Sequence, residues 1–172
     1  MSQPETAWAG KWLTVLRDGK WEYVSRVGGV EAVVILAMDE DRNVLLIDQY
    51  RVPLGRRCIE LPAGLIGDEH EGDTVLDAAR RELEEETGYA CTGVEELGVF
   101  HASPGMVTEG FTLVRATGLT RIGEGGGIDG EDIIVHRVPL AEVPAFVAAK
   151  RAEGAAIDVK VLLLLAESLL TP

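Results

Sequence analysis

The order of the apolar segments along this chain predicts an α/β fold in which a mixed sheet packs between helices. Runs of strand length come first, one strongly helical segment follows, and further strands and two more helical segments complete the chain. The length of 172 residues suits one domain with a substantial core. Apolar residues at 47% and charged residues at 26% make an ordinary globular composition.

The predicted strands are short apolar or aromatic runs separated by turn residues. Residues 12–16 and 21–26 flank Asp18-Gly19, which is a good turn signal, so we expect an N-terminal β-hairpin. The other expected strands are 30–38, 44–48, 58–61, 93–101, 111–116 and 133–138, and the later helices are 140–150 and 159–170.

The charge of the chain restricts the partners it can have. Sixteen basic and 29 acidic residues give a net charge of −13. A general nucleic-acid binder would carry a basic surface, so we expect no nucleic-acid partner. An anionic substrate would also be repelled unless a metal ion or a local group of arginines offset the charge.

Cysteine usage and the chain ends bear on the compartment. Cys58 and Cys91 form no disulfide-rich pattern and are expected to be reduced thiols in a cytoplasmic protein. The first ten residues carry no basic and apolar signal, and the apolar run 161–166 is too short to cross a bilayer. We therefore expect no membrane association.

Residues 74–87 form the segment with the clearest helix signals. Thr74 and Asp77 resemble a capping box with Asp in place of Glu, which predicts the helix start. Gly88 follows at the position where a left-handed C-cap glycine is expected.

The acidic residues of this helix are its most unusual feature. Glu82, Glu85 and Glu86 share one face, where like charges at this spacing repel. They also lie in the last turns, at the negative end of the helix dipole. Either they form a solvated face, or a hard cation such as Mg²⁺ or Mn²⁺ compensates them.

The sequence around these acids resembles a known family. Residues 81–89, RELEEETGY, match the second half of the Nudix box, G-x5-E-x7-R-E-U-x-E-E-x-G-U. The first half departs from the box, because Asp73 stands where the family has Glu. Gly67 fits the box glycine by spacing, whereas Gly64 fits it if 60–64, ELPAG, corresponds to the same segment of the ADP-ribose pyrophosphatase-like branch.

The resemblance implies the Nudix α/β/α sandwich with a mixed sheet and an N-terminal β-hairpin extension. In this branch the N-terminal strands swap across a homodimer and help to bind the nucleoside base. It therefore implies a hairpin and dimerisation segment over 1–28 and a hydrolase domain over 29–172. Trp21 could stack on adenine, and packing in the dimer or the core is the alternative for its ring.

The resemblance also implies a site for two or more Mg²⁺ or Mn²⁺ ions. The implied metal ligands are Glu82, Glu86 and the backbone carbonyl of Ala63, with waters completing the coordination. Arg81 would assist catalysis by orienting a carboxylate.

Two residues are open as the general base. Residues 103–109, SPGMVTE, resemble a segment of the same branch, in which the loop glutamate can act as base or hold metal-linked water. Glu109 is the matching residue here. In other members of the branch a box glutamate takes this role, which would be Glu85.

Substrate contacts are implied before the box. In the resembling branch the arginine of a QYR segment contacts the diphosphate, which points to Arg51, with Arg56 and Arg57 as the next candidates. Glu60 would help to hold the substrate or the metal-site loop.

The implied reaction is Mg²⁺-dependent hydrolysis of the diphosphate bond of ADP-ribose, or of a similar nucleoside diphosphate sugar, to a nucleoside monophosphate and a sugar phosphate. The alternatives are another nucleotide sugar, such as GDP-mannose or UDP-glucose, and a noncatalytic binding module of the same fold. The intact Glu82, Glu85 and Glu86 argue against the binding module.

Other polar features are expected to carry no chemistry. Residues 123–130, GEGGGIDG, lack the Lys-Ser/Thr of a P-loop and are interpreted as a plain connector. His70 and His101 are expected to be noncatalytic, and the role of the long loop 66–72 is open.

Overall fold

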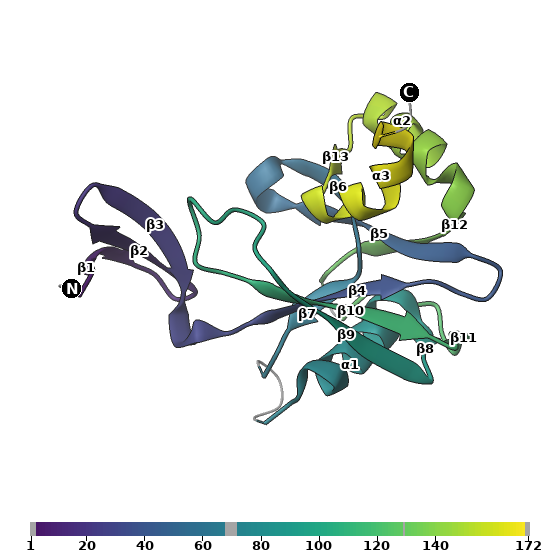
Figure 1. Cartoon of the computed structure of the whole chain (residues 1–172), viewed down its shortest axis with the longest axis horizontal. Coiled ribbons are helices and arrows are strands. Elements are labelled where there is room, and N and C mark those ends of the chain that lie inside the picture. The colour runs from purple at the N-terminus through teal and green to yellow at the C-terminus, as the bar shows by residue number, and fades with distance from the viewer. Residues whose placement is uncertain (1–2, 68–71, 129, 171–172) are drawn as a thin grey trace.

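Two four-stranded sheets and three helices form the main body, and a third sheet made by the N-terminus projects from it (Figure 1). The computed structural model describes residues 3–67, 72–128 and 130–170. His70 and the middle of the loop 66–72 lie outside the described residues.

The first sheet has the strand order β7-β4-β10-β9 and is mixed. Strand β10 runs parallel to β4 and antiparallel to β9. Its strands are β4 (Ala32–Ala37), β7 (Ala63–Leu65), β9 (Gly93–Phe100) and β10 (Phe111–Thr117). Each of β4, β9 and β10 lies where the sequence predicts a strand.

The second sheet has the order β12-β5-β6-β13. Its strands are β5 (Asn43–Arg51), β6 (Arg56–Glu60), β12 (Ile133–Pro139) and β13 (Ala156–Ile157). An isolated antiparallel bridge between Met38 and Val44 links it to the first sheet at the turn between β4 and β5.

The helices cover opposite sides of these strands (Figure 1). Helix α1 (Val75–Thr87) packs on the first sheet, whereas α2 (Val143–Ala152) and α3 (Leu162–Leu170) pack together over the second. Two 3₁₀ turns, η3 (Leu140–Glu142) and η4 (Val159–Val161), precede α2 and α3, so the two predicted helices each begin as a tighter turn. None of the helices in the part of the chain described here combines the length and the apolar character that a membrane crossing needs.

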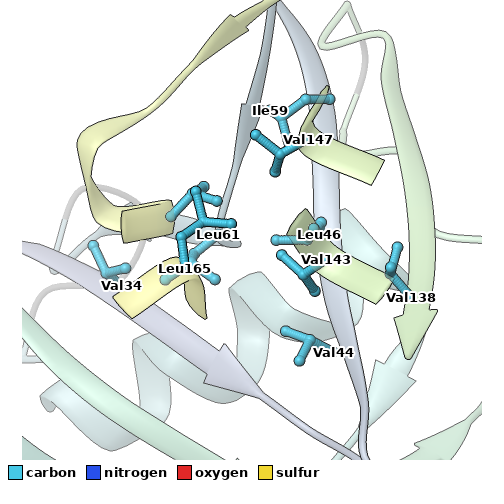
Figure 2. Packing of buried hydrophobic residues seen from close by; sticks show 10 residues of the cluster. Val34, Val44, Leu46, Ile59, Leu61, Val138, Val143, Val147 and Leu165 are labelled. Carbon is cyan, nitrogen blue, oxygen red and sulfur yellow. The ribbon is translucent and has the colours of Figure 1, made fainter. Parts of the chain in front are cut away.

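Strand β4 separates two apolar clusters because successive side chains of a strand point to opposite faces. Val33 and Ile35 pack with Leu83 of α1, whereas Val34 packs with Val143 of α2. Figure 2 shows the second cluster, in which Leu165 of α3 and strand residues surround Val143. Both faces of the central strands are therefore buried, which confirms the predicted mixed sheet between helices.

The N-terminal sheet consists of β1 (Glu5–Ala9), β2 (Leu13–Asp18) and β3 (Trp21–Arg26) in that order. The predicted hairpin is confirmed as β2 and β3, and β1 is an additional strand. Two minor elements complete the connections: η1 (Val27–Gly29) follows β3, and η2 (Val52–Leu54) joins β5 to β6. A two-stranded sheet pairs β8 (Tyr89–Ala90) with β11 (Thr120–Arg121).

Candidate active site

A cavity of about 410 Å³ opens beside the C-terminal half of α1. Its other walls come from strands β4 and β7, the ends of β3, β5 and β6, the start of β10 with the loop before it, and the turn η4. Ile128 and Glu131, which precede β12, complete the lining. Six glutamates line it against three basic side chains, so its wall is predominantly negative. These residues are Glu60, Glu82, Glu85, Glu86, Glu109, Glu131, Arg26, Arg51 and Lys160.

Helix α1 places three of these glutamates, and its start is fixed by local bonds. The Thr74 hydroxyl accepts a hydrogen bond from the Asp77 backbone N–H at 3.2 Å, and the Asp77 carboxylate accepts one from the Thr74 N–H at 3.4 Å. The helix ends at Gly88, whose φ of 72° is left-handed and whose N–H donates to the Glu84 carbonyl. The predicted capping box and C-cap glycine are both confirmed.

Glu86 is the most deeply buried acid of the cavity, with 4% of its surface exposed. Its Oε2 accepts a hydrogen bond from the Ala63 backbone N–H at 2.9 Å. Burial raises the pKa of Glu86 to about 8, against the effect of the Ala63 N–H, and the charges of Glu82 and Glu131 raise it further. Burial disfavours the charged form of Glu86, so a nearby cation would stabilise that form strongly.

The absence of a side chain at Gly64 leaves room for the Glu82 carboxyl group. A Cβ atom at residue 64 would overlap the Glu82 carboxyl group, whereas one at Gly67 would meet nothing within 4 Å. Gly64 is therefore the glycine that the close approach of β7 and α1 requires. This contact favours Gly64 over Gly67 as the equivalent of the box glycine.

Arg81 lies against the acids, with 14% of its side chain exposed. Its Nη1 is 2.9 Å from Glu82 Oε1 and 3.6 Å from Glu85 Oε2. Its Nη2 donates to the Leu65 carbonyl at 3.3 Å and lies 3.6 Å from Asp73 Oδ2. Asp73, which departs from the family pattern, thus contacts the arginine that also pairs with Glu82 and Glu85.

Arg51 and Glu60 form a second charged group on the cavity wall. Arg51 Nε and Nη2 donate to the two Glu60 carboxylate oxygens at 2.7 and 2.8 Å, which is a bidentate pair. Arg56 and Arg57 are not part of this wall. Arg57 instead pairs with Asp48 of the neighbouring strand β5 at 2.6 Å.

Glu109 lines the cavity at a place where its segment contacts strand β3 of the N-terminal sheet. Its carboxylate forms a short ion pair with the Arg26 guanidinium at the end of β3. The Val24 N–H donates to the Met106 carbonyl, and the Thr108 N–H donates to the Val24 carbonyl, each at 2.9 Å. The segment 103–109 is therefore docked along β3, and Glu109 is fixed by this docking.

Trp21 is not brought to the same cavity. Its side chain lies on β3, is 59% exposed, and lines a separate hollow of about 430 Å³ with His101 and Pro104. Arg81 does not line the cavity either, but it contacts Glu82, which does. Trp21 therefore lies apart from the other predicted site residues within one chain.

Arg26, Glu131 and Lys160 line the cavity but were not predicted as site residues. Glu131 Oε2 accepts the Ile128 N–H at 3.0 Å, and Lys160 Nζ is 2.8 Å from Asp158. All three come from strand ends, loops or turns without a motif of their own. No signal in the sequence distinguishes them from the other charged residues of the chain.

The donor set fits a hard cation. No three histidine, cysteine, aspartate or glutamate side chains in residues 3–67, 72–128 and 130–170 form a complete metal-binding group. Magnesium needs no such group, because it uses one or two carboxylates and keeps several waters. Glu82 and Glu86, on successive turns of α1, would provide these carboxylates, and the Ala63 N–H bonds to Glu86.

The comparisons with known proteins agree with this geometry. Residues 29–158 match the model of the NUDIX domain. The chain is 31% identical over 118 residues to the ADP-ribose pyrophosphatase of Bacillus subtilis, covering 69% of this chain and 60% of that protein. It is 36% identical over 146 residues to the GDP-mannose pyrophosphatase of Cronobacter sakazakii, covering 80% and 72%.

A third relative has a different name. The methanol dehydrogenase activator of Bacillus methanolicus is 34% identical over 121 residues, covering 70% of this chain and 64% of that protein. The chain thus spans less than two-thirds of the length of this relative and of the B. subtilis enzyme.

The fold comparison covers nearly the whole chain. The crystal structure of an ADP compounds hydrolase superposes with a TM-score of 0.70 at 25% identity, covering 97% of this chain and 91% of the other. Together with the domain match and the box residues of α1, this result shows that the chain belongs to the Nudix family.

Proposed function

We propose that this chain hydrolyses the diphosphate bond of ADP-ribose or a similar nucleoside diphosphate sugar, using Mg²⁺ or Mn²⁺. The products would be a nucleoside monophosphate and a sugar phosphate. The observation that carries the proposal is that the buried Glu86 lines one cavity together with Glu82, Glu85 and Arg51. Relatives named for ADP-ribose and GDP-mannose hydrolysis support the substrate class.

Each side chain has a separate task in this proposal. Glu82, Glu86 and the Ala63 carbonyl would hold the cations, two or more in number, and Arg81 would keep Glu82 and Glu85 oriented. Bound Mg²⁺ would neutralise the diphosphate charge and make water a better nucleophile.

The substrate needs cationic contacts as well. Arg51 uses two of its five N–H groups for Glu60, and we propose that others bind the diphosphate oxygens. Glu60 would keep the guanidinium plane facing the cavity. This pre-positioning lowers the entropic cost of binding.

One of three carboxylates that line the cavity, Glu85, Glu109 or Glu131, would accept the proton of the attacking water. A catalytic base contributes about 10²–10⁴-fold. Glu85→Gln, Glu109→Gln and Glu131→Gln, compared for kcat at saturating Mg²⁺, identify the base as the variant with a loss of that size. If none of the three loses as much as tenfold, the base is not among them.

We further propose a homodimer formed through residues 1–28, in the cytoplasm. Trp8, Trp12 and Trp21 expose 58, 68 and 59% of their surface on the N-terminal sheet, which supports an interface there. Both cysteines are free thiols, which supports a reducing compartment. If Trp21 stacks on the base, Trp21→Ala raises KM; an unchanged KM removes that role.

The decisive test is a panel of ADP-ribose, GDP-mannose and UDP-glucose with Mg²⁺, assayed for release of the nucleoside monophosphate. We expect hydrolysis of at least one substrate and a loss of at least about 100-fold for Glu86→Gln, since it removes a charged metal ligand. Glu84→Gln is the matched control, because Glu84 is exposed on the same helix and does not line the cavity.

The outcomes separate the alternatives. Preference for GDP-mannose or UDP-glucose replaces ADP-ribose within the same mechanism. Full activity of Glu86→Gln contradicts the metal assignment, and no hydrolysis of any substrate by the wild-type chain favours a binding module.

A further inference from the structure

The glycine-rich segment Gly123–Gly127 lies against the C-terminal end of α1. Strand β8 begins directly after α1, and β11 pairs with it, Thr120 opposite Ala90 and Arg121 opposite Tyr89. This pairing carries the chain back to Gly88, at the end of the helix that holds the cavity glutamates. Figure 1 shows β8 and β11 side by side next to α1.

Backbone hydrogen bonds join the segment to the helix end. Gly126 N–H donates to the Glu86 carbonyl at 2.9 Å, and Gly127 N–H donates to the Glu85 carbonyl at 3.0 Å. Gly123 N–H donates to the Gly88 carbonyl at 3.0 Å. The last turn of a helix leaves its carbonyls without intrahelical partners, and here a segment about forty residues later supplies them.

The contact requires glycine on both sides. A Cβ atom on Gly125 would lie 2.7 Å from the Glu86 carbonyl oxygen, and one on Gly88 would lie 2.6 Å from the Gly125 nitrogen. These close neighbours are backbone atoms, which cannot rotate away as a side chain can. Gly125 also has a φ of 68°, in the left-handed region.

The bonds act on the residues that carry the carboxylates. Glu86 is held at its side chain by the Ala63 N–H and at its backbone by the Gly126 N–H. The donated N–H groups also place positive dipole ends at the negative end of the helix, where three glutamates gather. The same segment leads into Ile128, whose N–H donates to the Glu131 carboxylate, and both residues line the cavity.

We propose that Gly88 and Gly125 are positioning residues, which lock the glycine-rich segment onto α1 and so fix the Glu85 and Glu86 carboxylates for cation binding. This inference rests on the proposed function only in taking a divalent cation as the occupant of the cavity. The residues act through the backbone and do not touch the substrate.

The test is Gly125→Ala, with Gly19→Ala as the matched control. Gly19 has a similar φ of 59°, but a Cβ atom there would meet nothing within 4 Å, so the control carries the backbone strain without the collision. Mn²⁺ binding is measured by electron paramagnetic resonance of the free ion, and folding by circular dichroism. We expect the Mn²⁺ dissociation constant to rise at least about tenfold in Gly125→Ala and to stay unchanged in Gly19→Ala.

A folded Gly125→Ala variant that binds Mn²⁺ as the wild type does overturns the proposal. A second measurement covers the case in which Gly125→Ala does not fold. In the wild-type chain the Gly126 and Gly127 amides must exchange slowly with solvent deuterium, and exchange at the rate of an open loop contradicts the proposal.

Failure of the proposed function has a different signature. If the wild-type chain binds Mn²⁺ but hydrolyses no nucleotide sugar, the proposed substrate is contradicted and the positioning role of Gly88 and Gly125 is not. A wild-type chain that binds no Mn²⁺ contradicts both the metal dependence and the positioning of a cation site.

Discussion

The two ends of α1 are held in opposite ways. At the start, Thr74 and Asp77 satisfy each other's backbone groups within one turn. At the other end, the carbonyls of Glu85 and Glu86 are satisfied by Gly127 and Gly126 from a distant loop. The end that carries the cavity acids therefore depends on tertiary contacts in addition to its local Gly88 cap, whereas the start depends on local sequence alone.

The largest effect on this comparison is expected from Gly64→Ala, at the acid-bearing end. The new methyl group would displace the Glu82 carboxyl group, because a side chain yields more easily than the strand. We expect Mg²⁺ affinity and kcat/KM to fall about 10–100-fold, while the melting temperature changes little. Titration calorimetry and steady-state kinetics measure the two quantities.

Gly67→Ala is the control, in which we expect lower stability and unchanged Mg²⁺ affinity. Gly67 has a φ of 78° and open space around it, so alanine there costs about 1–2 kcal/mol of backbone strain but displaces no carboxylate. Equal Mg²⁺ affinity in Gly64→Ala and the wild type would show that Glu82 is not a ligand.

The second effect is a dependence of metal binding on pH. The pKa of Glu86 is about 8 in the metal-free fold and 4.5 ordinarily, so the folded state holds an extra proton between these values. Metal-free stability should therefore fall as pH rises from about 4.5 to about 8. Mg²⁺ must displace this proton, so its affinity should rise about tenfold per pH unit up to about 8 and then level off.

Calorimetric Mg²⁺ titrations at pH 6, 7, 8 and 9 measure how the Mg²⁺ affinity changes with pH. Glu86→Gln has no proton to release at this position, so its weaker binding should lose most of the slope. A wild-type affinity that is flat from pH 6 to 8 contradicts a protonated Glu86.

The smallest effect is expected at the helix start. Thr74→Ala removes the hydroxyl that accepts the Asp77 N–H, which should cost about 1 kcal/mol of unfolding free energy and about 2–4 °C in melting temperature. The cavity glutamates lie two turns or more away, so kcat should stay within about twofold. A tenfold loss of kcat would mean that the two helix ends are not independent.

The fold could be predicted where the signal is local. The capping box, the C-cap glycine and the period of the strands depend on residues a few positions apart, and all were confirmed. Strand β1 was not predicted, because its five residues are all exposed and show no buried face. Strand β13, at the edge of the second sheet, was not predicted either, because its two residues are too few for a periodic pattern.

The site could be predicted where helix geometry places it. Glu82, Glu85 and Glu86 share a face because of their spacing, and they do line one cavity. Arg26 and Lys160 come from opposite ends of the chain, and only tertiary packing brings them to the same wall. The glycine-rich connector was interpreted as having no role because its partners, the carbonyls of α1, have no side-chain signature.

Arg26 and Lys160 also lie outside residues 29–158, the span that matches the family model. The family model therefore matches a shorter stretch than the one that lines the cavity. A protein trimmed to the recognisable stretch would keep every box residue and lose the ion-pair partner of Glu109 together with one lysine of the wall. The span that defines the family and the span that builds the cavity wall therefore have different borders.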